Sequence, residues 1–155
     1  MTPAASADDE DVGGRTLELA RAYQTLLAEG RLDEWIALWH DDALLEFPFA
    51  PAGRPAAYRG KDEILEYMTH AAGRIATDAV EELRVHTASD PQVLIVELST
   101  RGHLVESGAP YDQRYVCVFE ARDGLLWRYR EYWNPLVSID AHGGFDEWMA
   151  ATRKN

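Results

Sequence analysis

The segment RDGLLWRYREYWNP, residues 122–135, shows most directly what kind of fold the chain adopts. Its Asp-Gly pair stands between two alternating runs, which is a strong signal for a β-hairpin. Side chains along a strand point alternately to its two faces. By parity, one face carries a carboxylate among three aromatic rings: Trp127, Tyr129, Glu131 and Trp133. The other face is predicted to be the outer, solvated one and carries Arg128, Arg130 and Tyr132.

Glu131 is unexpected on the aromatic face, because burying an unpartnered carboxylate costs free energy and raises its pKa. A carboxylate of this kind is protonated near neutral pH and suits the transfer of a proton to or from a bound substrate. The alternative is structural: Glu131 pairs with a buried arginine, or accepts a hydrogen bond from Tyr111 or Trp127. The alternation favours the first interpretation.

The rest of the chain is predicted to supply helices first and most of the strands afterwards. Apolar residues at helical spacing indicate helices at 15–29, 32–40 and 61–75. Alternating runs indicate strands at 43–49, 80–87, 92–107, 111–121 and 125–133, and a short amphipathic segment at 145–151 packs back. Gly102 is expected to bend the longest strand.

This order of elements indicates an α+β fold. The three helices of the N-terminal half are expected on the concave face of a curved antiparallel sheet with a mixed edge. Such a cone-shaped α+β barrel holds a ligand in its open end.

Composition limits the partners of the chain. Its 155 residues suit one domain, and 27 acidic against 15 basic residues give a net charge of −12. Neither nucleic acid nor an anionic membrane is expected as a partner, since both attract positive charge. No apolar run approaches the roughly 18 residues of a membrane span. Cys117 is the only cysteine, so no intrachain disulfide forms, and a cytoplasmic location is expected.

The N-terminal segment differs from the rest. Residues 1–14 are acidic and rich in Gly and Ala, and they lack the basic start and apolar middle of a secretory signal. We predict a disordered tail at 1–14 and a single domain at 15–155.

Two regions resemble proteins of the nuclear-transport-factor-2-like superfamily, which includes ketosteroid isomerases and SnoaL-like polyketide cyclases. The segment RAYQTLLAEGRLDEWIALWHDDALLEFPF, residues 21–49, is similar to the first two helices and first strand of ketosteroid isomerases. The segments VELSTRGHLVESG at 96–108 and REYWN at 130–134, together with Tyr111, resemble the phenazine-biosynthesis A/B proteins. The resemblance implies a cystatin-like, SnoaL-like α+β barrel that hosts isomerases, cyclases, dehydratases or plain binding proteins. It also implies a homodimer formed through the outer sheet face.

The resemblance to ketosteroid isomerases keeps one catalytic position and loses another. Tyr23 falls where those enzymes have the tyrosine of their oxyanion hole. Phe47 stands in place of their catalytic aspartate, and the neighbouring Glu46 points to the other face by parity. The resemblance therefore does not imply a true steroid isomerase.

The resemblance to the phenazine proteins implies a second set of residues. Glu131 matches their acid/base glutamate and Tyr111 matches a tyrosine of their pocket. Tyr67 replaces their helix-three histidine, and their binding arginine has no clear match. This partial match implies a different substrate.

The candidate site combines these residues. The candidate catalytic residues are Glu131, Tyr23 and Tyr111, and the candidate substrate-binding residues are Phe47, Tyr67, His70, Trp127, Tyr129, Trp133 and Asn134. Each has a structural alternative: the rings belong to the core, His70 is solvated, and Asn134 caps the chain before Pro135. Neither a metal nor a cofactor is expected, because the five histidines lack ligand spacing and no Gly-rich loop opens a helix.

We therefore expect an acid/base enzyme of isomerase, cyclase or dehydratase type. It would act on a small, apolar, aromatic or polyketide-like metabolite in an enclosed pocket, with Glu131 as the proton shuttle. The alternative is a non-catalytic small-ligand-binding or accessory protein of the same fold. A third interpretation is a dimerisation domain in which aromatic side chains fill the cone.

Overall fold

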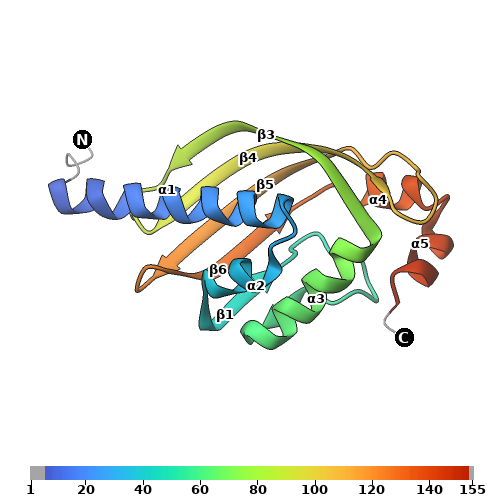
Figure 1. Ribbon diagram of the computed structural model, residues 1–155, viewed down its shortest axis with the longest axis horizontal. Helices are drawn as coiled ribbons and strands as arrows, with labels where there is room; N and C mark the ends of the chain where they lie inside the picture. The colour runs from blue at the N-terminus through green and yellow to red at the C-terminus, as the bar shows by residue number, and fades with distance from the viewer. Residues whose placement is uncertain (1–5, 154–155) are drawn as a thin grey trace.

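A computed structural model describes residues 6–153 and shows, within them, a curved six-stranded sheet and five helices (Figure 1). The helices are α1 (Ala7–Ala28), α2 (Leu32–Ala37), α3 (Gly60–Arg74), α4 (Pro135–Ala141) and α5 (Phe145–Ala151). The strands are β1 (Trp39–Glu46), β2 (Ala57–Arg59), β3 (Ile75–Thr87), β4 (Val93–Leu104), β5 (Gln113–Arg122) and β6 (Leu125–Tyr132).

The sheet is open and mixed. Its order is β2-β1-β6-β5-β4-β3, so β2 and β3 are both edges and the sheet does not close into a barrel. Strands β1 and β6 run parallel, and every other neighbouring pair is antiparallel. The predicted α+β fold with a curved, mixed-edge sheet is confirmed.

The helices occupy two places (Figure 1). Helix α1 packs on β3, β4 and β5, while α3 packs on β1 and β2, as predicted for the N-terminal half. Helices α4 and α5 pack against each other at one end of the sheet. Helix α4 was not among the predicted elements, although Asn134 caps it by accepting a hydrogen bond from the Leu136 N–H at 3.1 Å.

Helix α1 begins eight residues before its predicted start. The Ser6 hydroxyl accepts from the Asp9 N–H and the Asp9 carboxylate accepts from the Ser6 N–H, so the two residues form a capping box. Acidic side chains in the first turn also interact favourably with the helix dipole. Residues 7–14 are therefore helical where disorder was predicted, and residues 1–5 of the predicted tail lie outside the described residues.

Helix α2 is shorter than predicted because the residues that follow it pair with β6. The helix was expected to reach residue 40 but ends at Ala37, and Trp39 already belongs to β1. The Leu126 N–H donates to the Leu38 carbonyl at 2.8 Å and Trp39 pairs with Leu126. A sheet partner distant in sequence thus ends the helix.

The β5–β6 hairpin confirms the Asp-Gly signal. Asp123 and Gly124 have positive φ angles of 53° and 76°, as a tight two-residue hairpin turn requires. Beyond the turn, Tyr129 pairs with Phe119 and Glu131 pairs with Cys117. Tyr129 is buried, so this end of β6 has the predicted inner face.

The predicted face of Trp127 is wrong, because β6 contains a bulge. The register shifts between Glu120 and Ala121, and Leu126 takes the inner position opposite Ala121 with no exposed surface. Trp127 is then the extra residue, and the Arg122 guanidinium stacks over its ring at 3.7 Å. Parity holds only as long as a strand has no bulge.

The core and the outer face of the sheet are chemically distinct. The core centres on buried aromatic rings from α1, α2 and the sheet, including Tyr23, Trp35, Trp39, Phe119 and Tyr129. The outer face carries ion pairs instead: Arg128 to Glu46 at 2.6 Å and Arg130 to Glu120 at 2.9 Å. The predicted outward orientation of Glu46 and of the two arginines is confirmed. Among residues 6–153, no helix has the length and apolar character needed to cross a membrane.

Candidate functional site

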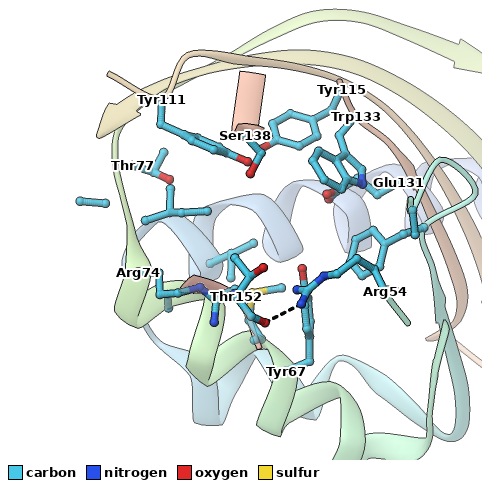
Figure 2. A pocket seen from close by; sticks show the side chains of 18 of the residues that line it. Arg54, Tyr67, Arg74, Thr77, Tyr111, Tyr115, Glu131, Trp133, Ser138 and Thr152 are labelled. Atoms are coloured by element: carbon cyan, nitrogen blue, oxygen red, sulfur yellow. Dashed lines mark hydrogen bonds between the residues drawn. The ribbon is translucent and has the colours of Figure 1, made fainter. Parts of the chain in front are cut away.

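A cavity of about 440 Å³ lies between the helices and the inner face of the sheet (Figure 2). Its walls come from α1, α3, α4 and α5, from β2, β3, β5 and β6, and from the loop before β2. Aromatic and aliphatic side chains dominate, with a few polar groups, as in most small-molecule sites. The lining includes Phe47, Tyr58, Tyr67, Met68, Tyr111, Tyr115, Glu131, Trp133 and Trp148.

Glu131 is the carboxylate in this aromatic wall. Protein atoms surround it, while the cavity itself leaves it partly accessible to water. Burial raises the pKa of Glu131 from 4.5 to about 7. The Tyr129 hydroxyl donates to Glu131 Oε2 at 2.8 Å and opposes this rise, because it stabilises the charged carboxylate. Glu131 can therefore both accept and release a proton near neutral pH.

Tyr129 contacts both Glu131 and Cys117. The Tyr129 hydroxyl lies 3.1 Å from Cys117 Sγ and 2.8 Å from Glu131 Oε2. Because the phenol has one proton, donation to Glu131 leaves its oxygen to accept the Cys117 thiol proton. Burial raises the pKa of both Tyr129 and Cys117 well above the usual values, so both stay neutral. Of these three groups, Glu131 is therefore the one that ionises near neutral pH.

Tyr111 and Tyr67 lie on different walls of the same cavity (Figure 2). Tyr111 is 5% exposed, and the side chains of Ser138 and Gln113 hydrogen-bond its phenol. Tyr67 comes from α3 and stacks on Tyr58, with ring centroids 4.4 Å apart. Burial raises the pKa of both Tyr111 and Tyr67, so both remain hydrogen-bond donors across the physiological range.

Tyr23 lies deeper than the resemblance to ketosteroid isomerases implied. It is 3% exposed, and its ring packs against Tyr129 at 4.8 Å. It lines a smaller hollow of about 120 Å³, which shares Glu131 with the larger cavity. The Tyr23 hydroxyl makes no hydrogen bond of normal geometry within residues 6–153, and burial raises its pKa well above the usual value.

Phe47 and Trp133 line the large cavity. The Phe47 ring lies 5.2 Å from the Tyr67 ring, so the position of the isomerase aspartate is part of an apolar wall. The Trp133 Nε1 atom is buried and has no hydrogen-bond partner in the described part of the chain.

Three predicted substrate-binding residues line neither the large cavity nor the smaller hollow, whereas Tyr129 lines the smaller one. Trp127 is excluded from the cavity by the bulge in β6. His70 is exposed on α3, where its ring Nδ1 lies 2.8 Å from the Glu66 carbonyl oxygen. Asn134 caps α4, which agrees with its structural alternative. These positions correct the expectation that all three contact a ligand in the cavity.

The cavity contains residues that the sequence analysis did not select: Arg54, Arg74, Tyr115, Ser138, His142, Trp148 and Thr152. Ser138 lies in α4, His142 is the C-cap of α4, and Trp148 lies in α5. An Asn-Pro pair at 134–135 is typical of a helix start and could have indicated α4. No local sequence pattern around Arg54 or Arg74 indicates that these residues line a cavity. Within residues 6–153, no group of three or more metal-ligating side chains is placed to hold a metal ion.

Comparison with protein families gives a match over most of the chain. A family model described as a SnoaL-like domain matches residues 20–129. The Bacillus subtilis protein YesE, which is uncharacterised, is 37% identical over 130 residues, or 84% of this chain and 88% of YesE. An uncharacterised PhzA/B-like protein of Pseudomonas aeruginosa is 32% identical over 121 residues, or 78% of this chain and 85% of the relative.

Solved structures agree with this match. The crystal structure of a candidate isomerase from Bacillus subtilis has a TM-score of 0.81 and 36% identity, covering 85% of this chain and 95% of that one. A Mycobacterium tuberculosis protein crystallised with estradiol-17β-hemisuccinate has a TM-score of 0.68 and 20% identity, covering 82% and 96%. The second likeness shows the fold alone.

Proposed function

The chain belongs to the SnoaL-like family of the nuclear-transport-factor-2-like superfamily, and from this premise we propose that it is a small-molecule acid/base enzyme of isomerase, cyclase or dehydratase type. One observation carries the proposal. Glu131 has a pKa of about 7 and faces a cavity lined mainly by aromatic and aliphatic side chains. A general acid or base is most effective when its pKa lies near the working pH.

The proposed reaction begins with ionised Glu131. Its carboxylate takes a proton from a carbon next to a substrate carbonyl, and the electron pair moves to the carbonyl oxygen. Tyr111 donates a hydrogen bond to that oxygen as negative charge develops. Glu131 then returns the proton to another substrate atom, or to a leaving hydroxyl. Tyr23 is proposed to assist from the smaller hollow that it shares with Glu131.

The proposed substrate is an aromatic or polyketide-like metabolite. A volume of about 440 Å³ falls in the range of sites for small organic ligands. Phe47, Tyr67 and Trp133 line the cavity and offer apolar contacts to such a molecule. The steroid ester bound by the Mycobacterium tuberculosis neighbour is consistent with an apolar ligand in this fold.

A second candidate function is small-ligand binding without chemistry. It is favoured by the surroundings of Glu131: burial and the Tyr129 hydroxyl account for its pKa, and no second ionised group contributes. The two functions differ in a direct assay. The protein is incubated with polycyclic and polyketide metabolites and analysed by mass spectrometry. An enzyme would form a new product, whereas a binding protein would only retain an unchanged ligand.

Replacing Tyr129 with phenylalanine is expected to raise the pKa of Glu131 by about 1, because a charge-assisted hydrogen bond is lost. The measurement is the titration of the Glu131 carboxyl carbon by NMR. Tyr132→Phe is the matched control, since Tyr132 makes an edge-on contact with Phe49 outside the cavity and should leave the titration unchanged. An unchanged or lower pKa in Tyr129→Phe would show that this bond does not stabilise the carboxylate.

We also propose that the outer sheet face forms a homodimer. Val116 is 38% exposed there, on the face opposite Cys117, beside the outward Tyr132. Val116→Lys is expected to convert a dimer to a monomer in sedimentation velocity, because a charge would be buried between copies. Val105→Lys is the control, since Val105 is 55% exposed in the turn after β4. A wild-type protein that sediments as a monomer would contradict the proposal.

A further inference from the structure

We infer that the substrate carries an anionic group, such as a carboxylate, which Arg54 and Arg74 hold between them in the cavity. The inference rests on the proposed function, because it concerns the ligand of the same cavity. Arg54 comes from the loop before β2, and Arg74 is the last residue of α3. Figure 2 shows both guanidinium groups directed into the cavity, one from each side of Thr152.

Neither arginine is neutralised by another side chain of residues 6–153. Although acidic residues outnumber basic ones by 27 to 15, no carboxylate within residues 6–153 forms an ion pair with Arg54 or Arg74. Arg54 donates one hydrogen bond to the Thr152 carbonyl at 2.5 Å and lies over the Trp148 ring at 5.4 Å. The Arg74 side chain makes no hydrogen bond in the described part of the chain. Most N–H donors of the two groups are thus left for a ligand.

The two positive charges also act on each other. Burial lowers the pKa of Arg54, and the charge of Arg74 lowers it further. Glu131 does not relieve this repulsion, because neither arginine contributes to its pKa. An anion placed between the two guanidinium groups would be attracted by both, and a planar carboxylate or a phosphate can accept two parallel N–H bonds from each.

The arrangement sets the orientation of the ligand. Its anionic end would lie at Arg54 and Arg74, and like-charge repulsion would keep that end away from ionised Glu131. The aromatic body would then extend along Trp133 and Phe47 toward Glu131. Because the whole chain has a net charge of −12, it repels anions in general, so a preference for an anion must arise locally.

The test uses two probes of nearly equal shape, 2-naphthoate and 2-naphthamide, and isothermal titration calorimetry on the whole protein. The wild type is expected to bind the naphthoate about 10-fold or more tightly than the naphthamide. Arg74→Gln is expected to remove this preference by weakening only the naphthoate, whereas Arg74→Lys should keep part of it. Arg114→Gln, a change of equal charge at an exposed position of β5, should have no effect.

Two results would overturn the inference. One is equal affinity of the wild type for the two probes, which requires no variant and so does not depend on the folding of Arg74→Gln. The other is an equal loss for both probes in Arg74→Gln. The same titration on Glu131→Gln separates this inference from the proposed function. The naphthoate preference should persist there whether or not Glu131 proves to be needed for turnover.

Discussion

Replacing Glu131 with glutamine should abolish turnover while leaving the fold and ligand binding nearly intact. Glutamine has almost the same shape and can still accept the Tyr129 hydrogen bond, but it cannot take up a proton. General acid–base catalysis contributes typically about 10² to 10⁴ in rate, so a loss of this size is expected. The measurement is product formation from the metabolite that the wild type converts, with ligand affinity determined in parallel.

The same substitution should stabilise the protein above neutral pH. The pKa of Glu131 is about 7 in the folded chain and 4.5 ordinarily, so the folded state binds its proton more tightly. The stability supplied by this group is therefore complete below about pH 4.5 and is lost as the pH rises through about 7. Because glutamine does not titrate, the variant should gain up to about 3 kcal/mol over the wild type at about pH 8. Urea unfolding at several pH values measures the difference.

Glu81→Gln is the matched control for both measurements. Glu81 is exposed on β3, outside the cavity lining, so the same chemical change should alter neither the rate nor the pH dependence of stability. A Glu131→Gln protein with full activity would disprove the proposed mechanism. If the difference in unfolding free energy between Glu131→Gln and the wild type does not grow with pH, the Glu131 carboxylate is not held in a poorly solvated site.

Replacing Gly102 with alanine should destabilise the protein and distort the cavity wall. A Cβ atom at Gly102 would lie 2.2 Å from the Ala76 carbonyl oxygen, and backbone cannot swing aside as a flexible side chain can. Gly102 pairs with Thr77 where the register of β3 shifts, and Ala76 and Thr77 line the cavity. Overpacking of this kind costs about 1–3 kcal/mol. Thermal unfolding and ligand affinity should both report the loss.

The control for this prediction is the same substitution at Gly73. Gly73 lies inside α3 with no atom near the site of an added Cβ, and it has an ordinary helical backbone. Alanine there should stabilise the protein by about 0.5–1 kcal/mol, because glycine is a poor helix former. A Gly102→Ala protein as stable as the wild type would mean that β3 and β4 can separate locally without cost.

Local patterns predicted most of the fold but only part of the site. The Asp123–Gly124 turn and the alternation around Tyr129 depend on neighbouring residues, so the sequence was sufficient to predict them. Trp127 shows the limit: its bulge places Leu126, rather than Trp127, against Trp39, and that packing depends on β1, which is distant in sequence. Likewise, the sequence could place neither Arg54 nor Arg74 in the cavity, because only the fold brings their two segments together.

Helices α4 and α5 have a consequence for how relatives of this protein could differ. The family model ends at residue 129, whereas Ser138, His142, Trp148 and Thr152 complete the cavity from a segment that follows it. The segment that forms these two short helices adds no strand to the sheet. Exchanging this terminal segment between homologues would therefore change which compounds fit the cavity, while Glu131 and its scaffold stay the same. Chimeras joined just after β6 offer a route to new selectivity that leaves the core undisturbed.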